Sequence, residues 1–237
     1  MVEVTGLTKG FSRLIAVDKV SFVAPAGEVF GLLGENGAGK TTTLRMLATL
    51  LIPDGGTATI NGYDLVREPE QVRRQLGVLF NPGLYDRLTA RENIAYFGKL
   101  YGVPASELSE RVDGLLTRFG IEEYAHRRAG SLSRGMRQRV ALARVLVHDP
   151  PVLILDEPTT ALDVAGTRLV HEFISEARER GKTIILSSHN MAEVEKLCQR
   201  VAIIHRGRIA LEGTLHQVKA QRDSLEDILL GLGGDRG

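Results

Sequence analysis

Residues 34–41 read Gly34-Glu35-Asn36-Gly37-Ala38-Gly39-Lys40-Thr41. This stretch fits the spacing G-x-x-x-x-G-K-[ST], and it lies between an apolar segment, 29–33, and an expected helix over 39–51. Its glycines let backbone N–H groups approach phosphate oxygens closely, and the start of the helix adds a partial positive charge. With the adjacent Thr42, the stretch predicts a phosphate-binding loop in which Lys40 bridges the outer phosphates of ATP and the Thr41 hydroxyl ligates Mg²⁺.

A second motif is the pair of carboxylates Asp156 and Glu157, which follows the apolar segment 152–155. On its own, such a pair is usually a strand running into a solvated loop. Beside a phosphate-binding loop it is more informative, because ligands of open α/β folds bind at the carboxyl ends of the strands. We expect Asp156 to hold Mg²⁺ through its water shell and Glu157 to orient and polarise the attacking water.

Hydrophobic patterning and turn residues predict an alternation of strands and helices. The expected strands cover 20–23, 29–33, 57–60, 152–155, 183–187, 201–204 and 209–212. The expected helices cover 39–51, 89–102, 104–120, 133–148, 165–180 and 190–198. This order predicts an α/β fold with a mostly parallel sheet, and a block of helices between β-rich segments.

The bulk properties restrict the function. The chain has 237 residues and a formal net charge of +1, so no global field recruits nucleic acid or a membrane surface. Its single cysteine excludes an internal disulfide, and a cytosolic setting fits best. The longest apolar runs are far below the about 20 residues that cross a bilayer, so we expect any membrane role to come through a partner.

Four further segments identify the family that the sequence resembles. They are Ser131-Leu132-Ser133-Arg134-Gly135-Met136-Arg137-Gln138, Thr160-Ala161-Leu162-Asp163, His189 and Phe11. The first is similar to the signature sequence LSGGQ of ABC ATPases, from which Arg134 and Met136 depart. The others resemble the D-loop, the switch histidine and the aromatic residue that stacks on adenine. With the two motifs above, the resemblance covers almost the whole chain in the correct order.

The resemblance implies a fold and a division of the chain. The fold is a P-loop NTPase (RecA-like) core with an N-terminal antiparallel β subdomain and an inserted α-helical subdomain. Residues 1–237 form a single ATPase domain, in which 1–87 and 150–220 make up the catalytic core and the β subdomain. Residues 88–149 form the helical subdomain with the signature, and 221–237 form a C-terminal tail.

The resemblance also implies roles for individual residues. Ser133 is placed to cap a helix, so its hydroxyl and nearby N–H groups, including that of Gly135, form an anion site. In ABC proteins this site binds the γ-phosphate of a nucleotide held by a second subunit. His189 is expected to donate a hydrogen bond to the γ-phosphate, although an isolated histidine here is usually an ordinary residue before a helix capped by Asn190. Phe11 is expected to stack on adenine.

The family usually places a glutamine where the sheet joins the helical block, and the matching segment 76–82 has none. Asn81 offers the same amide on a shorter arm, so it is the candidate for contacting Mg²⁺ and the attacking water. In the following segment, Leu84, Tyr85 and Leu88 form either part of the core or an exposed apolar patch that receives a membrane subunit. Most members of a run of arginines are expected on a solvated helix face, and Arg134 alone is a candidate for contacting ribose or phosphate. The run comprises Arg127, Arg128, Arg134, Arg137, Arg139 and Arg144.

These observations favour the ATP-binding subunit of an ABC exporter, and segments 83–89 and 224–228 resemble its sodium- and drug-exporting branch. The expected partners are a second copy or a homologous ATPase subunit, bound head to tail, and integral-membrane permease subunits. The expected location is cytoplasmic, on the inner face of the cell membrane. An alternative is a soluble ABC ATPase that acts on DNA or ribosomes, but the chain has no long coiled coil or second ATPase domain. The Asp-Glu pair and the signature oppose a P-loop kinase or GTPase.

Overall fold

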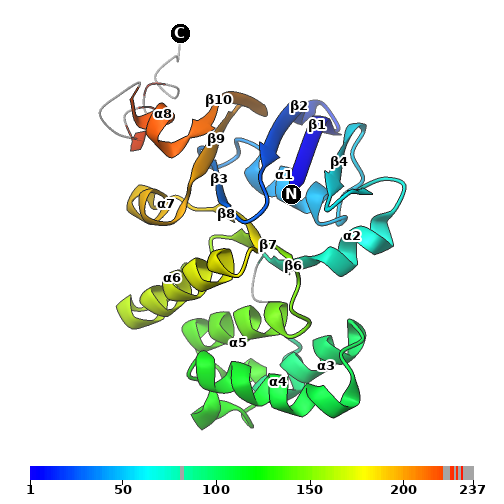
Figure 1. Ribbon diagram of the computed structural model, residues 1–237, viewed down its shortest axis with the longest axis vertical. Helices are drawn as coiled ribbons and strands as arrows, with labels where there is room; N and C mark the ends of the chain where they lie inside the picture. The colour runs from blue at the N-terminus through cyan, green and yellow to red at the C-terminus, as the bar shows by residue number, and fades with distance from the viewer. Residues whose placement is uncertain (81–82, 221–224, 227, 229–230, 232–237) are drawn as a thin grey trace. The chain divides into compact units, whose positions relative to one another are not determined.

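The computed structural model describes residues 1–80, 83–220, 225–226, 228 and 231 (Figure 1). The chain divides into two compact units. The first comprises Met1–Leu76, Pro151–Glu157 and Ile174–Gly237, and the second comprises Gly77–Pro150 and Pro158–Phe173. The expected helical segment 88–149 falls inside the second unit, which also includes 77–87 and 158–173.

The first unit contains an antiparallel sheet with the strand order β2-β1-β4-β5. Its strands are β1 (Val2–Phe11), β2 (Leu14–Ala24), β4 (Gly55–Ile60) and β5 (Tyr63–Asp64). Val2 lies opposite Ala24 on one side and Ile60 on the other, and all three side chains are fully buried. The inward-facing residues of these strands therefore form one core, as the alternating burial of β1 and β2 indicates.

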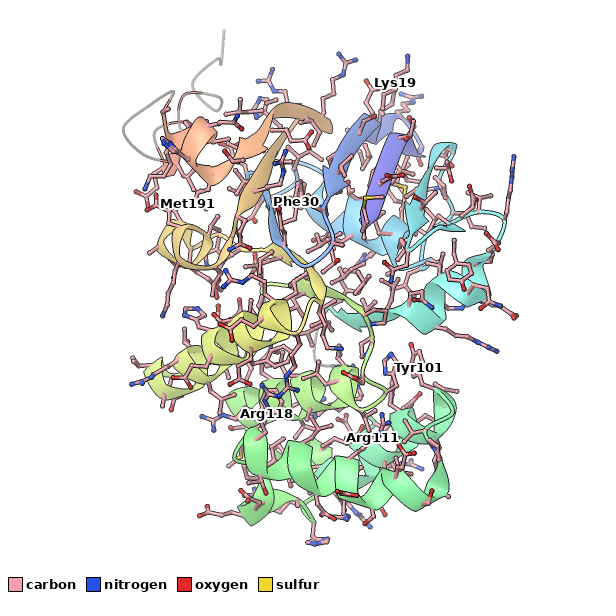
Figure 2. All side chains as sticks on the ribbon, in the orientation of Figure 1. Lys19, Phe30, Tyr101, Arg111, Arg118 and Met191 are labelled. Atoms are coloured by element: carbon pink, nitrogen blue, oxygen red, sulfur yellow. The ribbon has the colours of Figure 1, made fainter. Side chains whose placement is uncertain are left out.

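The second sheet of this unit is mostly parallel and has the order β10-β9-β3-β8-β7. Its strands are β3 (Val29–Leu33), β7 (Val152–Asp156), β8 (Thr183–Ser187), β9 (Arg200–His205) and β10 (Arg208–Thr214). β3 pairs in parallel with β8 and β9, β7 pairs in parallel with β8, and only β10 runs antiparallel to its neighbour β9. Every residue of β3 and β8 is buried, including Phe30 (Figure 2). Such continuous apolar strands are typical of a parallel sheet that is covered on both faces.

The helices of the first unit begin at the ends of strands. They are α1 (Lys40–Leu47), α2 (Pro69–Gln75), α7 (Met191–Leu197) and α8 (Leu215–Lys219). α1 ends four residues earlier than expected, because the backbone of Thr49 turns into the left-handed region at φ 57°. α2 was not among the expected helices, although Pro69 stands at its N-terminus, where proline is favoured.

The second unit is helical. It contains α3 (Ala90–Leu100), α4 (Ala105–Arg118), α5 (Arg134–Leu146) and two 3₁₀ turns, Glu122–Tyr124 and Ala129–Ser131. β6 (Leu76–Leu79) and α6 (Val164–Glu179) each cross the boundary between the units. A capping box opens α3: the Thr89 hydroxyl accepts from the N–H of Glu92, whose carboxylate accepts from the N–H of Thr89. The apolar face of α4 is buried at Leu108, Val112 and Leu116.

Candidate nucleotide-binding site

The glycine-rich loop joins β3 to α1 and requires glycine at two positions. Gly34 has φ 147°, and a Cβ atom added there would lie 2.2 Å from the carbonyl oxygen of Ile204. Gly39 has φ 112°, and an added Cβ atom would lie 2.5 Å from the carbonyl oxygen of Ala16. Gly39 is also the N-cap of α1, and no side chain caps this helix start. The first N–H groups of α1 are therefore available to an anion.

Lys40 is buried, and its ammonium group holds the loop. It donates hydrogen bonds to the carbonyl oxygens of Gly34 at 2.6 Å and Glu35 at 2.9 Å. Burial lowers the pKa of Lys40, while the carboxylates of Glu157, Asp156 and Glu35 act in the opposite direction. A buried cation near three carboxylates, at the uncapped start of a helix, is suited to a polyanionic ligand that is bound with a metal ion.

Thr41 and Asp156 lie side by side. The Thr41 hydroxyl donates to Oδ2 of Asp156 at 3.2 Å, and the Ser187 hydroxyl donates to Oδ1 of the same carboxylate. Asp156 ends β7 and Ser187 ends β8, and the two residues are register partners in the parallel sheet. The carboxyl ends of β7 and β8 and the N-terminal end of α1 therefore meet at one carboxylate. Ser187 was not identified from the sequence, and its only signal is its place at the end of a predicted strand.

Glu157 has an uncommon backbone conformation with φ 50°. Its N–H group donates to the carbonyl oxygen of Ser187 at 3.0 Å and to the Ser187 hydroxyl at 3.2 Å. Its carboxylate Oε1 lies 3.3 Å from Nδ1 of His189. The His189 side chain is 71% exposed, so it is open to a ligand or to water. The structure thus brings Glu157 and His189 together, which the sequence placed after two separate strands.

A cavity of about 140 Å³ lies over the loop. Its lining residues are Ala16, Glu35, Asn36, Gly37, Gly39, Lys40, Thr41, Thr42 and Glu157. Eight of these nine residues were expected at the site from the sequence. The exception is Ala16 on β2, which no motif identifies.

Phe11 ends β1 in the hairpin with β2, and its side chain is 46% exposed. The Lys9 ammonium lies 5.9 Å from the centre of the Phe11 ring. Phe11 does not line the cavity. Its exposed ring lies in the same antiparallel sheet as Ala16, which does line the cavity, and is accessible for stacking.

The signature residues belong to the second unit. Ser133 is the N-cap of α5, and its hydroxyl accepts a hydrogen bond from the N–H of Met136 at 3.3 Å, as the sequence predicts. Gly135 lies close to the D-loop segment, because an added Cβ atom would be 3.2 Å from the carbonyl oxygen of Ala161. Asn81 lies outside the described residues, as do Ser224 and Asp227 of the C-terminal segment.

Arg144 is an exception to the expected solvated arginine face, because it is buried. Its guanidinium lies 4.4 Å from the centre of the Phe97 ring and donates to the carbonyl oxygen of Gly83 at 2.7 Å. Burial lowers the pKa of Arg144. Of the neighbouring apolar residues, Leu84 is buried and Tyr85 is half-exposed, so only part of this segment is open to a partner.

The described residues include neither a cluster of metal-binding side chains nor a helix suited to a membrane. In the part of the chain that the structure describes, no group of three or more His, Cys, Asp or Glu side chains is placed to hold a metal ion. None of the described helices is long and apolar enough to span a bilayer.

Residues 17–160 match the family model described as ABC transporter. The chain is 49% identical over 205 residues to the ABC transporter ATP-binding protein NatA of Bacillus subtilis (strain 168), covering 86% of this chain and 83% of that protein. It is 39% identical over 216 residues to the Nod factor export ATP-binding protein I of Rhizobium sp. (strain N33), covering 91% and 71%. A solved dimer of the ATP-binding cassette MJ0796, in a post-hydrolysis state bound to ADP and Pi, is 26% identical with a TM-score of 0.84, covering 91% of this chain and 99% of that one.

The fold and the loop with its carboxylates define a P-loop ATPase, as the sequence predicts. The chain belongs to the ABC transporter family, as an ATP-binding subunit that hydrolyses ATP.

Proposed function

We propose that this chain binds Mg·ATP between the glycine-rich loop and the carboxylates of Asp156 and Glu157, and hydrolyses it there. The observation that carries the proposal is the convergence of Lys40, Thr41, Asp156 and Glu157 at the carboxyl ends of β3 and β7. In this arrangement the loop N–H groups and Lys40 bind the β- and γ-phosphates. Thr42 and the loop residues from Gly34 to Gly39 complete the cradle.

The residues present fit a magnesium ion. Thr41 and Asp156 offer a hydroxyl and a carboxylate oxygen 3.2 Å apart, and Mg²⁺ is usually held by one or two carboxylates together with substrate phosphates. A bound Mg²⁺ neutralises charge that develops on the phosphate oxygens. The Ser187 hydroxyl and the N–H bonds of Glu157 fix the two carboxylates relative to each other. Asn81 stays a predicted further contact to the ion and the attacking water.

Glu157 is the group that orients and polarises the attacking water. Its carboxylate borders the cavity, and its backbone is held in the left-handed region by two hydrogen bonds to Ser187. His189 lies 3.3 Å from this carboxylate and is exposed, so it is placed to donate a hydrogen bond to the γ-phosphate. Phe11 stacks on the adenine from the β-hairpin.

The active state is a head-to-tail dimer of ATPase subunits. The solved relative that holds ADP and Pi is dimeric, and the N-cap of α5 offers Ser133 and the N–H of Gly135 to the γ-phosphate bound by the other subunit. In this scheme the helical subdomain 88–149 carries the signature, while 1–87 and 150–220 carry the nucleotide and 221–237 form a tail.

The motion of this dimer drives export by integral-membrane permease subunits, which hold the chain at the cytoplasmic face of the membrane. Support comes from the Nod factor export relative and from the half-exposed Tyr85 in the segment after β6. The permease, rather than this chain, contains the pathway for the exported substrate.

The test is Mg²⁺-dependent ATP hydrolysis by the purified chain, compared with the variant Lys40→Met. We expect Lys40→Met to abolish ATP binding and hydrolysis, because the loop loses its cation. The matched control is Lys219→Met, a lysine of the same unit that pairs with Glu195 on the surface. Full hydrolysis by Lys40→Met would overturn the proposal. Co-purification with a permease and a transport assay in vesicles test whether the chain drives export by permease subunits.

A further inference from the structure

The turn that carries His189 has a buried pair of polar residues at its base. Ser188 and Glu193 are 3% and 2% exposed. The Ser188 hydroxyl donates a hydrogen bond to Oε2 of Glu193 and accepts one from the N–H of Asn190 at 3.1 Å. The Asn190 side chain in turn accepts from the N–H of Glu193 at 3.2 Å and caps α7, which begins at Met191 (Figure 2).

This arrangement is similar to a capping box, but the Ser188 hydroxyl stands between the two usual partners. In a direct capping box, the side chain three residues into the helix bonds the N–H of the N-cap residue. Direct boxes open two other helices of the described part of the chain, α3 with Thr89 and Glu92 and α8 with Thr214 and Gln217. At α7 the corresponding residue is Glu193, but its carboxylate bonds the Ser188 hydroxyl, and this hydroxyl bonds the N–H of Asn190. Glu193 is therefore connected to the N–H of Asn190 through Ser188, the residue that precedes His189. These two hydrogen bonds form a relay.

The relay fixes the backbone on both sides of His189. Ser188 and Asn190 are joined by a hydrogen bond across the histidine, and Ser188 is joined to the first turn of α7 through Glu193. Burying a carboxylate is costly unless it is hydrogen-bonded, so removal of the Ser188 hydroxyl disturbs Glu193 as well. The His189 side chain itself is 71% exposed, so we expect the backbone turn to be the main determinant of its position.

We propose that Ser188 and Glu193 are positioning residues that hold His189 against Glu157. The proposal rests on the proposed function, in which His189 contacts the γ-phosphate. The relay sets the turn so that Nδ1 of His189 lies 3.3 Å from Oε1 of Glu157. Ser188 and Glu193 act through the histidine and touch neither the nucleotide nor the attacking water.

The experiment compares steady-state ATP hydrolysis and ATP binding of Ser188→Ala and Glu193→Ala with two conservative variants. We expect kcat to fall about tenfold to a hundredfold in both alanine variants, because small displacements of catalytic groups have effects of this size. ATP affinity stays within about twofold, since the loop and Lys40 are untouched. Ser188→Thr and Glu193→Gln keep the hydroxyl and an acceptor oxygen, so both retain most of the activity. The control is Gln217→Ala, which breaks the direct box of α8 in the same unit and leaves kcat unchanged.

A double-mutant cycle separates this proposal from the proposed function. In a His189→Ala background, Ser188→Ala causes no further loss of kcat if it acts through the histidine. An equal loss in both backgrounds overturns the positioning role. If His189→Ala lowers kcat while Ser188→Ala does not, the positioning role alone fails; if His189→Ala leaves kcat unchanged, the proposed role of His189 fails and the positioning role with it.

A second measurement, the NMR signal of His189, applies to variants whose ATP hydrolysis is too slow to compare. In ¹³C-histidine-labelled protein, the His189 resonance, assigned with His189→Ala, shifts in Ser188→Ala and Glu193→Ala but stays in place in Gln217→Ala. An unmoved His189 resonance in Ser188→Ala overturns the proposal.

Discussion

The side-chain amide of Gln138 donates a hydrogen bond to the carbonyl oxygen of Pro158 at 2.8 Å. Gln138 lies on α5, five residues after the N-cap Ser133, and is buried. Pro158 follows Glu157 directly in the chain. Since Gly135 also approaches the carbonyl oxygen of Ala161, the signature helix packs against the segment that leaves the proposed catalytic carboxylate. Both contacts lie within the second unit.

The first prediction concerns this hydrogen bond. Gln138→Leu removes the donor and leaves the Pro158 carbonyl buried, which costs about 1–3 kcal/mol of stability. Urea unfolding of the purified chain measures this loss. Gln71→Leu, at an exposed position of α2, is the control and changes stability by about 0.5 kcal/mol or less. A Gln138→Leu variant as stable as the control would contradict the importance of this contact.

The second prediction concerns Glu157. Glu157→Gln keeps the shape of the side chain but removes the charge that polarises the attacking water, so we expect kcat to fall by a factor of about 10²–10⁴. ATP affinity is retained, because Lys40 and the loop are unchanged. Hydrolysis assays and equilibrium ATP binding measure the two effects, with Glu179→Gln at an exposed position of α6 as the control. Full activity of Glu157→Gln would exclude the water-positioning role.

The third prediction concerns the signature. Ser133→Ala removes the cap of α5, which costs about 1 kcal/mol, and it also abolishes ATP-dependent dimerisation and hydrolysis. Thr89→Ala removes the cap of α3 at a similar cost and separates the two effects. Size-exclusion chromatography with ATP should show dimers for Thr89→Ala and monomers for Ser133→Ala. Dimers in both variants would mean that Ser133 only caps its helix.

The fourth prediction concerns adenine. Phe11→Ala weakens ATP binding by about 1–3 kcal/mol if the ring stacks on the base. Leu14→Ala removes an exposed side chain opposite Phe11 in the same hairpin and should leave the affinity unchanged. Calorimetric titration with ATP compares the two variants, and equal affinities would reject the stacking role.

The fifth prediction is a pH dependence of stability. The Lys9 ammonium and the N–H of Gly10 hold the pKa of Asp54 below its usual value. A lowered folded-state pKa means that the stabilisation is fully present above the unfolded value of about 3.9 and is lost as pH falls through the folded value. The native chain should therefore exceed Asp54→Asn in stability at pH 7 and converge with it in stronger acid. Urea midpoints at several pH values measure the difference, and a pH-independent gap would contradict it.

The sequence predicted most of the features that depend on local patterns. The strands β3, β7 and β8 and the capped starts of α3, α5 and α7 appear where expected, because apolar runs and N-cap residues act over a few neighbours. The parallel sheet also follows from the alternation of strands and helices. The loop 34–41 was identified because its chemistry requires a fixed spacing of residues.

Features that depend on contacts between distant residues were not predictable. Ser187 is significant only because β8 pairs with β7 and brings its hydroxyl to Asp156. Arg144 is buried because Phe97 and the carbonyl of Gly83 lie beside it, and a single sequence does not reveal either neighbour. The relay from Glu193 to Ser188 looks like an ordinary helix start in the sequence, where only the Asn190 cap is recognisable.

The division of the chain into interleaved segments has a consequence for synthesis on the ribosome. In the second unit, the ring of Phe119 packs at a tilt near the ring of Phe173, with centres 5.9 Å apart. In the first unit, β3 needs β8 and β9 as its neighbours. Neither unit can complete its core until residues far downstream have been translated. A nascent chain that has made only the glycine-rich loop therefore exposes an unpaired apolar strand, and such chains are prone to aggregate. We expect this ATPase to acquire its structure late, after most of the polypeptide has left the exit tunnel.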